Sequence, residues 1–368
     1  MLACLKVGGV FLFGCLAYLL FWPVPIQPMA WQAPIATAYT GDYQVNNALD
    51  EFERISMGSL SGPEAALESA NGVLYASSHE GWIVRASDDS QTLQPWVNVG
   101  GRPLGIDFDQ AGNLWVANAF KGLQKITPAG EVSLELAEAD GKPLLYADDL
   151  AIASDGKIYF SDASTRFSAK QVGDTLEASL LDIIEHSNNG RIIEFDPSTG
   201  ESTTLLDGLS FANGVAIDQA GKFLLVVETG EYRVHKVSLQ GNSKGQSSLV
   251  LDKLPGFPDN VHIGQDGRFW IGLTAPRSKV IDDFADQPFW RKVILRLPEF
   301  MRPKVVHYGM VLAIDEDGQV LLNLQSPSGM VFATTGVAET DQHIYVTSLS
   351  APFLAKYDKK ALGLKVGL

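Results

Sequence analysis

The chain has 368 residues with a formal net charge of −15, and its 46% hydrophobic and 19% charged residues are typical of a folded globular protein. The acidic balance argues against a nucleic-acid partner, because phosphate backbones attract basic surfaces. The two cysteines, Cys4 and Cys15, both lie in the first apolar stretch, which excludes a disulfide framework and a cysteine zinc site elsewhere.

The N-terminus begins with an apolar run, because residues 7–22 carry no charge and follow Lys6. Its length is near the lower limit for a bilayer span, so residues 1–22 are read as an uncleaved transmembrane anchor, with a cleaved signal sequence as the alternative. The lysine places the N-terminus in the cytoplasm, and the rest of the chain is then expected on the extracytoplasmic side, periplasmic or lumenal. The proline-rich residues 23–50 are predicted to be a linker that holds the folded domain off the membrane.

A repeated pattern fills residues 51–368. Each copy has an alternating apolar strand, a turn of Asp, Asn and Gly, and a second strand rich in aromatic and β-branched residues, which predicts antiparallel hairpins. Third and often fourth strands follow each hairpin. About six such units predict an all-β fold, a six-bladed β-propeller, rather than a sandwich. The copies begin at Pro63, Pro103, Asp148, Asn213, Asp259 and Val331.

Two segments depart from this repeat. The stretch FERIS, from Phe52, precedes the first copy, and we expect it to supply the outer strand that closes the last blade. Residues 168–186 include DTLEASLLDIIEH, whose apolar residues have helical spacing, and they predict a short helix on a long loop over one mouth of the tunnel.

Oxygen-bearing side chains recur where the innermost strands begin. These strands run the same way along the tunnel, so their first residues are expected to meet at one mouth, and the candidates are Glu64, Asp148, Asn213, Asp259 and Asn260. Without lysine or arginine at equivalent positions, such carboxylates would repel one another unless a cation lay between them. Oxygen ligands favour one Ca²⁺ ion, with another divalent cation as the alternative. The competing explanation is that Asp and Asn occur at the starts of strands because their side chains cap the preceding turns.

Several stretches resemble the strictosidine synthase-like family, which includes the adipocyte plasma membrane-associated proteins and is related to gluconolactonases, regucalcin and paraoxonases. They are YADDLAIASDGKIYFSDASTRF, GRIIEFDPSTGESTTLLDGLSFANGVAI, LPGFPDNVHIGQDGRFWIGL and HIYVTSLSAPFLAKY, and the resemblance covers roughly residues 60–358. It implies a six-bladed propeller, with one calcium ion in the tunnel of the hydrolytic relatives. It also implies that Glu64, Asn213 and Asp259 are ligands, that Asn260 is one in the paraoxonase branch, and that Asp148 stands where the family usually has asparagine.

The leading functional hypothesis is calcium-dependent hydrolysis of a small lactone or ester, with the cation polarising the carbonyl. Because calcium-bound water ionises poorly at neutral pH, Asp259 or Asp148 is expected to act as base or nucleophile, and Asn213 to donate to the substrate oxygen. Arg166 and His262 are the candidates for substrate contact. A structural role is the competing reading of His262.

Two other classes of function stay open. One is a non-catalytic propeller scaffold whose cation is structural. This alternative is favoured because Leu104 and Ala119 occupy the positions at which paraoxonases carry a pair of histidines. The other is a carbon–nitrogen condensing enzyme, because such synthases use a glutamate of the last blade and Glu339 lies near that position. An acidic turn residue is the competing reading of Glu339.

Overall fold

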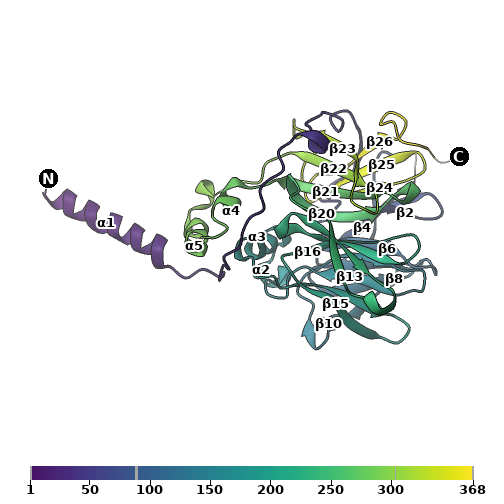
Figure 1. The fold of residues 1–368 in the computed structure, drawn as a ribbon, viewed down its shortest axis with the longest axis horizontal. Helices are drawn as coiled ribbons and strands as arrows, with labels where there is room; N and C mark the ends of the chain where they lie inside the picture. The colour runs from purple at the N-terminus through teal and green to yellow at the C-terminus, as the bar shows by residue number, and fades with distance from the viewer. Residues whose placement is uncertain (1, 88–89, 303, 367–368) are drawn as a thin grey trace.

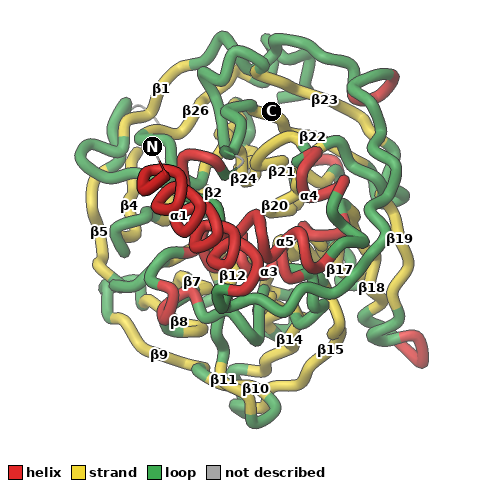
Figure 2. The backbone as a smooth tube through the Cα atoms, turned by 90° about the vertical axis from the view of Figure 1, so that its left-hand side faces the viewer, coloured by secondary structure: helices red, strands yellow, loops and turns green. Residues whose placement is uncertain are grey.

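A computed structural model describes residues 2–87, 90–302 and 304–366 of the chain. Six four-stranded antiparallel sheets surround a central axis, so the predicted six-bladed β-propeller is confirmed (Figures 1 and 2). In five of the sheets the first strand in chain order is innermost and the others follow outward. In the sixth sheet the same order runs outward through three C-terminal strands, and an N-terminal strand is added at the outer edge. A short hairpin lies outside the blades, formed by β10 (Glu138–Ala139) and β11 (Lys142–Pro143).

The first three blades occupy the first half of the propeller. Blade 1 contains β2 (Ala66–Glu68), β3 (Val73–Ser77), β4 (Trp82–Ser87) and β5 (Gln94–Asn98). Blade 2 contains β6 (Pro103–Phe108), β7 (Leu114–Asn118), β8 (Gly122–Ile126) and β9 (Val132–Leu136). Blade 3 contains β12 (Ala147–Ile152), β13 (Ile158–Asp162), β14 (Gly190–Asp196) and β15 (Glu201–Leu209).

The remaining blades complete the ring. Blade 4 contains β16 (Ala212–Ile217), β17 (Phe223–Glu228), β18 (Arg233–Ser238) and β19 (Ser247–Leu251). Blade 5 contains β20 (Gly256–Ile263), β21 (Phe269–Pro276), β22 (Gly309–Ile314) and β23 (Val320–Ser326). Blade 6 contains β24 (Thr334–Glu339), β25 (His343–Ser348), β26 (Phe353–Asp358) and β1 (Glu53–Ser56).

The ring is closed by β1, as the FERIS stretch predicted. β1 pairs antiparallel with β26, so that Ile55 lies opposite Leu354, and Ile55 is buried in a cluster that joins the last blade to the first. The middle strands pack against neighbouring blades on both faces, and β17 is accordingly buried along its whole length. That two-sided burial explains why these strands read as continuous apolar runs rather than as alternating ones.

Two helical insertions cover one face of the ring. α2 (Ala169–Val172) and α3 (Thr175–Glu185) connect β13 to β14, and α4 (Lys279–Asp283) and α5 (Pro288–Arg296) connect β21 to β22. α3 lies within the segment predicted to be helical, and it begins where Asp174 accepts a hydrogen bond from the backbone N–H of Glu177. Because second strands end on the face where innermost strands begin, both insertions lie over the same mouth of the tunnel (Figure 2). Single 3₁₀ turns occur at Gly41–Tyr43, Thr229–Glu231, Gly241–Ser243, Gln265–Gly267 and Glu299–Met301.

The N-terminal helix α1 (Leu2–Phe21) projects from this helical face (Figure 1). Met1 and the side chains of residues 2–11 lie outside the described part of the chain, so the predicted anchor falls partly on them. Within the described residues, no helix combines the length and apolar character needed to cross a membrane.

Residues 23–50, which the sequence predicted to be a linker, run along the propeller rather than standing free of it. The backbone N–H of Met29 donates to the carbonyl of Glu185 at 2.9 Å, at the end of α3. Trp31 and Leu49 are buried in separate core clusters of the propeller. The apolar residues between the prolines therefore hold this segment against the helical face and the outer blades.

Candidate active site and cation site

The five predicted ligands gather at the tunnel mouth beneath the helical insertions. Asn260 of blade 5 donates to the carboxylate of Glu64 before blade 1, with 2.6 Å between Nδ2 and Oε1. Asn213 of blade 4 donates to the hydroxyl of Thr229 at 3.2 Å and lies near enough to Asp259 to lower its pKa, and Asp148 of blade 3 is repelled by both Glu64 and Asp259. All five side chains are at most 7% exposed.

An irregularity repeated at the start of the innermost strands positions these side chains. In blades 2 to 6 the pairing of the first two strands shifts register there, leaving two consecutive residues in a β-bulge that turns side chains toward the axis. The six equivalent pairs, the first by analogy of its hydrogen bonds, are Glu64-Ala65, Leu104-Gly105, Asp148-Asp149, Asn213-Gly214, Asp259-Asn260 and Thr335-Gly336.

Small residues in this bulge let neighbouring inner strands approach closely. A Cβ on Gly214 would lie 2.3 Å from the backbone nitrogen of Val261, and one on Gly105 would lie 2.6 Å from the Cα of Asp149. Any larger side chain would push the inner strands apart at the level of the site. The glycines of this repeat therefore set the width of the mouth.

Four acceptor oxygens at the mouth have no hydrogen-bond donor among the described residues, namely Glu64 Oε2, Asn213 Oδ1, Asp259 Oδ1 and Asn260 Oδ1. Leaving a buried acceptor unsatisfied costs about 1–3 kcal/mol, and here four occur together, two of them on consecutive residues of β20. Oxygen ligands of this kind suit a hard cation such as Ca²⁺. Carboxylates alone do not suffice, because no group of three or more His, Cys, Asp or Glu side chains in the described ranges is placed to hold a metal. The asparagine oxygens are therefore needed to complete a cation site.

The electrostatics of the mouth are dominated by burial of negative charge. Burial raises the pKa of Glu64 to about 7, against the lowering effects of Arg102 and of the hydrogen bond from Asn260. Burial, followed by repulsion from Glu64 and then Asp259, raises the pKa of Asp148 well above its usual range. Burial, followed by repulsion from Glu64, also raises the pKa of Asp259 well above its usual range. A bound cation would oppose each of these shifts.

Arg102, which precedes the innermost strand of blade 2, is a buried cation that the sequence reasoning missed. Its guanidinium donates to the carbonyls of Gly62 at 3.1 Å and Leu349 at 3.4 Å, and its Nε has no partner among the described residues. The guanidinium lowers the pKa of Glu64, so a positive charge accompanies the carboxylates although the equivalent position of blade 2 itself is Leu104. The only signal in the sequence was one basic residue immediately before a strand start.

Thr335 is the blade 6 member of the repeat and was also missed. Its hydroxyl donates to the carbonyl of Glu64 at 2.6 Å and lies 2.7 Å from the hydroxyl of Thr347. These bonds fix the backbone on which Glu64 is carried. The prediction from the sequence considered acidic and amide side chains at the starts of strands, and this position has a threonine instead.

The two predicted substrate contacts lie in different surroundings. His262 is half-buried in β20, two residues beyond Asn260, and burial lowers its pKa to about 4, so the imidazole is neutral. Its Nδ1 has no partner among the described residues. Arg166 instead joins the lid to the N-terminal segment, with its Nε 2.5 Å from Glu185 Oε1 and a hydrogen bond to the carbonyl of Pro25.

Glu339 lies at the far end of β24 from Thr335 and so at the opposite end of the tunnel. It forms a fully buried ion pair with Lys359 at 2.7 Å and accepts a hydrogen bond from Trp270 Nε1 at 2.7 Å. This placement explains Glu339 as a structural charge. It removes the support for a condensing reaction at the mouth that depends on this glutamate.

An apolar roof closes the mouth above the polar cluster. Leu104, Tyr146 and Phe211 from the blades pack in one cluster with Ile26 of the N-terminal segment and Ile183 of α3. The hydroxyl of Tyr146 also donates to the carbonyl of Thr175 at 3.0 Å, which fastens α3 to blade 3. The helical insertion predicted over this mouth is therefore in place, and its inner side is hydrophobic.

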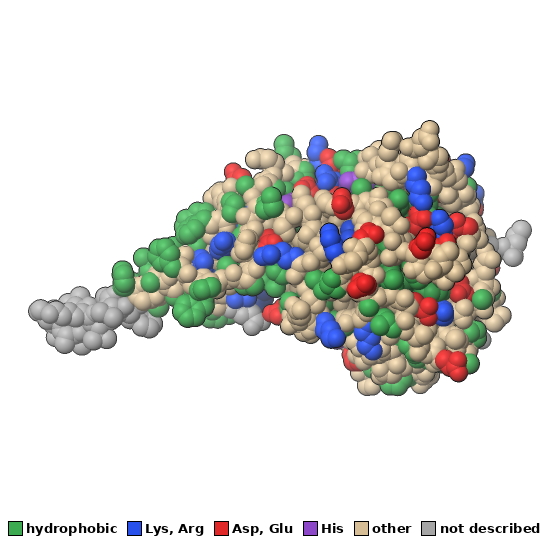
Figure 3. All heavy atoms as spheres, turned by 90° about the horizontal axis from the view of Figure 1, so that it is seen from below, with side chains coloured by type: hydrophobic (Ala, Val, Ile, Leu, Met, Phe, Trp, Pro, Cys, Tyr) green, Lys and Arg blue, Asp and Glu red, His purple; other side chains and the backbone are tan. Residues whose placement is uncertain are grey.

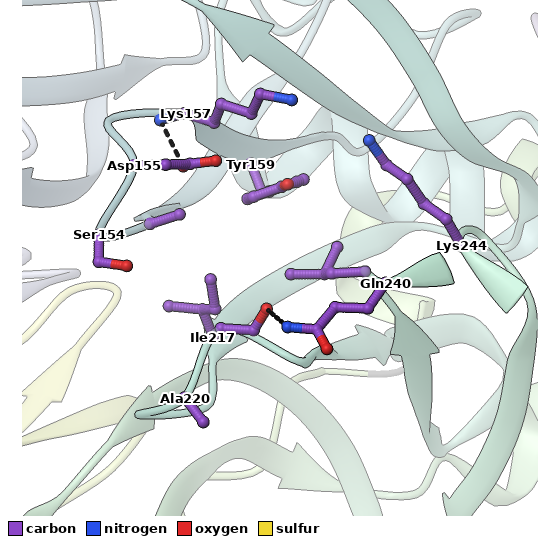
Figure 4. A pocket seen from close by; sticks show the side chains of 11 residues that line it. Ser154, Asp155, Lys157, Tyr159, Ile217, Ala220, Gln240 and Lys244 are labelled. Carbon is purple, nitrogen blue, oxygen red and sulfur yellow. Dashed lines mark hydrogen bonds between the residues drawn. The ribbon is translucent and has the colours of Figure 1, made fainter. Parts of the chain in front are cut away.

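A separate hollow of about 280 Å³ lies at the other end of the blade 3 and blade 4 inner strands (Figure 4). Lys157 and Lys244 reach its rim, and both pair with Glu194, at 2.7 Å and 2.5 Å. It contains none of the predicted site residues, since its lining comes from the end of β16 and the turns after β12 and β16, from Tyr159 of β13, and from the connection between β18 and β19. The hollow is therefore distinct from the candidate site.

Comparisons of sequence place these motifs in context. Residues 148–242 match the strictosidine synthase family, and residues 41–86 match the N-terminal part of strictosidine synthase-like proteins. The adipocyte plasma membrane-associated protein of Bos taurus is 31% identical over 357 residues, covering 91% of this chain and 84% of that protein. The human protein of that name is 31% identical over 363 residues, covering 92% and 85%. A strictosidine synthase-like protein of Arabidopsis thaliana is 35% identical over 252 residues, covering 66% and 60%.

Solved structures share the fold at low sequence identity. A gluconolactonase from Xanthomonas campestris superposes with a TM-score of 0.60 at 16% identity, covering 91% of this chain and 96% of that one. The calcium-binding protein regucalcin from Agrobacterium tumefaciens gives a TM-score of 0.58 at 16% identity, covering 86% and 95%. At such identities the likeness establishes the propeller architecture alone.

Proposed function

Since the chain belongs to the strictosidine synthase-like family, we propose that its tunnel mouth binds one Ca²⁺ ion and hydrolyses a lactone or ester. The observation that carries the proposal is the set of four buried acceptor oxygens without donors. The structural neighbours named as a gluconolactonase and as a calcium-binding protein support it.

Glu64, Asn213, Asp259 and Asn260 would hold the ion, because each presents one of these oxygens. The ion, when bound, supplies polarisation of the substrate carbonyl and charge to balance the developing oxyanion. Asn260 keeps Glu64 oriented through its 2.6 Å hydrogen bond, and Thr335 fixes the Glu64 backbone. The proposed ligands are thus held in position before substrate binds, and such preorganisation is what efficient stabilisation of a transition state requires.

Asp148 is the residue we propose as general base. No hydrogen bond to its carboxylate is found among the described residues, whereas Asn213 lowers the pKa of Asp259. A carboxylate that is buried but not committed to another donor is free to take a proton from a water molecule. Arg102 opposes the rise in the pKa of Asp148 and so favours its ionised form, the form that a general base requires.

The roof over the mouth favours an apolar substrate. Leu104, Tyr146 and Phe211 offer hydrophobic surface directly beside the polar cluster. A pocket with apolar walls and a few convergent polar groups binds small organic molecules and limits access of water. We therefore propose an ester or lactone with a hydrophobic substituent.

We also propose that residues 1–22, most of which form α1, anchor the chain in a membrane as a single pass, with the propeller on the extracytoplasmic side. The uncharged run after Lys6 supports this, as does the description of the relatives as plasma membrane-associated. The propeller is then presented to the membrane by its helical face, from which α1 projects (Figure 1).

The decisive experiment measures Ca²⁺ uptake and turnover on the full chain. Calorimetry should show one Ca²⁺ per chain, and hydrolysis of phenyl acetate or simple lactones should stop when a chelator removes it. Asp259→Ala should abolish both, whereas the exposed Asp252→Ala should change neither. Tight Ca²⁺ binding without turnover of any ester or lactone would instead favour a scaffold, and absence of Ca²⁺ binding would sink the proposal.

A further inference from the structure

A group of large apolar side chains is exposed around α5. Phe289 and Trp290 are 48% and 47% exposed, and Phe300 and Met301, just after the helix, are 79% and 56% exposed. Exposed apolar side chains are common singly, but a gathering that includes three aromatic rings marks an interaction surface. We call Phe289, Trp290, Phe300, Met301, Val305 and Val306 the α5 patch.

The α5 patch is continuous with the exposed end of α1. Arg296 of α5 donates to the carbonyls of Trp22 at 2.6 Å and Leu19 at 3.0 Å, which ties the two helices together. Phe21 and Trp22 are themselves 76% and 60% exposed. Figure 3 shows hydrophobic side chains gathered where the projecting helix meets the body, whereas acidic and basic groups are scattered over the rest of that view.

The charge around the patch is opposite to that of the whole protein. Residues 288–306 contain five basic residues and one acidic residue, in a chain whose net charge is −15. Arg291 and Arg296 use their guanidinium groups on backbone carbonyls. For Lys292, Arg302 and Lys304, no ion pair is found in the described part of the chain. Aromatic rings flanked by unpaired cations are the composition that lies at the headgroup level of anionic bilayers.

We propose that the α5 patch docks on the surface of a bilayer with anionic headgroups and holds the roofed tunnel mouth against it. α5 belongs to the insertion on the face where the innermost strands begin, so docking brings the roof next to the lipid. The proposal rests on the α1 anchor proposed above, to which it adds a second contact. It also indicates that hydrophobic substrates reach the mouth from the membrane rather than from water.

Tryptophan fluorescence of the full chain, reconstituted with lipids brominated on their acyl chains, tests this docking. Of the seven tryptophans, Trp22 and Trp290 are the two predicted to touch lipid. Trp22→Phe protein should keep a substantial part of the bromine quenching, and adding Trp290→Phe should remove the remainder. Replacing part of the phosphatidylcholine with phosphatidylserine should strengthen Trp290 quenching at least twofold, and Lys292→Gln with Lys304→Gln should cancel that gain.

The outcomes separate docking from anchoring. Protein that floats with the vesicles but loses all quenching with Trp22→Phe alone overturns the docking and leaves the anchor intact. Failure to float overturns the anchor and, with it, the docking. Leu249→Ser and Leu321→Ser, at exposed leucines on outer strands of blades 4 and 5, are matched controls and should leave the quenching unchanged. Burial of Trp290 by a second copy, seen as dimers that Trp290→Ser dissociates, would also overturn the proposal.

Discussion

Asn260 and Glu64, which are 196 residues apart in the chain, meet across the tunnel through a hydrogen bond of 2.6 Å. The bond uses the amide nitrogen and one carboxylate oxygen, so the remaining oxygen of each side chain is left without a donor. Both atoms belong to the group of acceptors at the mouth. This one contact therefore orients both side chains while leaving one acceptor oxygen of each available for the cation proposed above.

Arg102→Met should make the stability of the protein depend more strongly on calcium. The substitution removes donors to the carbonyls of Gly62 and Leu349, so the cation-free protein should lose roughly 1–3 kcal/mol. It also removes a positive charge that repels the ion, so Ca²⁺ affinity should rise. Thermal melts with and without Ca²⁺ measure both effects. The exposed Arg54→Met is the control, and equal calcium dependence in the two variants would contradict this role of Arg102.

Asp148→Asn should retain calcium and lose catalysis. Asparagine keeps an oxygen at this position, so Ca²⁺ affinity measured by calorimetry should change by less than about tenfold, whereas ester hydrolysis should fall by about 10²–10⁴-fold if Asp148 is the base. Since burial raises the pKa of Asp148, the wild-type rate should climb with pH as this carboxyl ionises. A variant with unchanged turnover would transfer the role of base to Asp259.

Asp182→Asn should remove a pH dependence of folding stability. Burial raises the pKa of Asp182 from 3.8 to about 7, although Ser164 and Asn189 donate to its carboxylate. The folded state therefore favours the protonated acid, and this contribution is complete below about pH 4 and is lost as the pH rises through about 7.

The measurement is the free energy of unfolding of wild type and Asp182→Asn between pH 5 and pH 8. The wild type should lose roughly 3 kcal/mol relative to the variant across this range, because each unit of pKa shift corresponds to about 1.36 kcal/mol and about two such units lie between pH 5 and the folded-state pKa of about 7. Using the difference between the two proteins cancels the titration of Glu64 and the other acids. A difference that does not change with pH would show that Asp182 ionises normally.

Glu339→Gln should destabilise the fold without affecting the tunnel mouth. It leaves the buried ammonium of Lys359 without its partner, which typically costs about 3–5 kcal/mol. Calcium affinity and hydrolysis, measured below the lowered melting temperature, should match those of wild type. The double variant Glu339→Gln with Lys359→Met should recover much of the stability. Loss of activity in a folded Glu339→Gln protein would revive a catalytic role for this residue.

The repeat was readable from the sequence because hairpins are local. The spacing of Asp-Gly and Asn-Gly turns, and the alternation before them, predicted the blades and their innermost strands. The FERIS stretch predicted the closing strand β1, and the apolar spacing near Thr175 predicted α3. Once the blades are known, strand polarity alone brings Glu64, Asp148 and Asp259 to one mouth.

Other features depended on contacts between distant parts of the chain. Nothing near Arg102 in the sequence shows that its guanidinium lies beside Glu64, and nothing near Glu339 shows its pairing with Lys359. The prolines after residue 22 suggested a free linker, but Trp31 packs into the propeller core. Composition predicts whether a segment is stiff or polar, whereas docking depends on an apolar surface supplied by other elements.

The sequence by itself determined the blade count, the ring closure and which oxygens begin the innermost strands, because each follows from short-range periodicity. Only the tertiary structure decided which of those oxygens stay without donors, that the Arg102 guanidinium lies beside Glu64, and that an apolar roof and an exposed aromatic patch share one face. The physical reason is that hydrogen-bond satisfaction, charge compensation and burial are properties of groups brought together by folding.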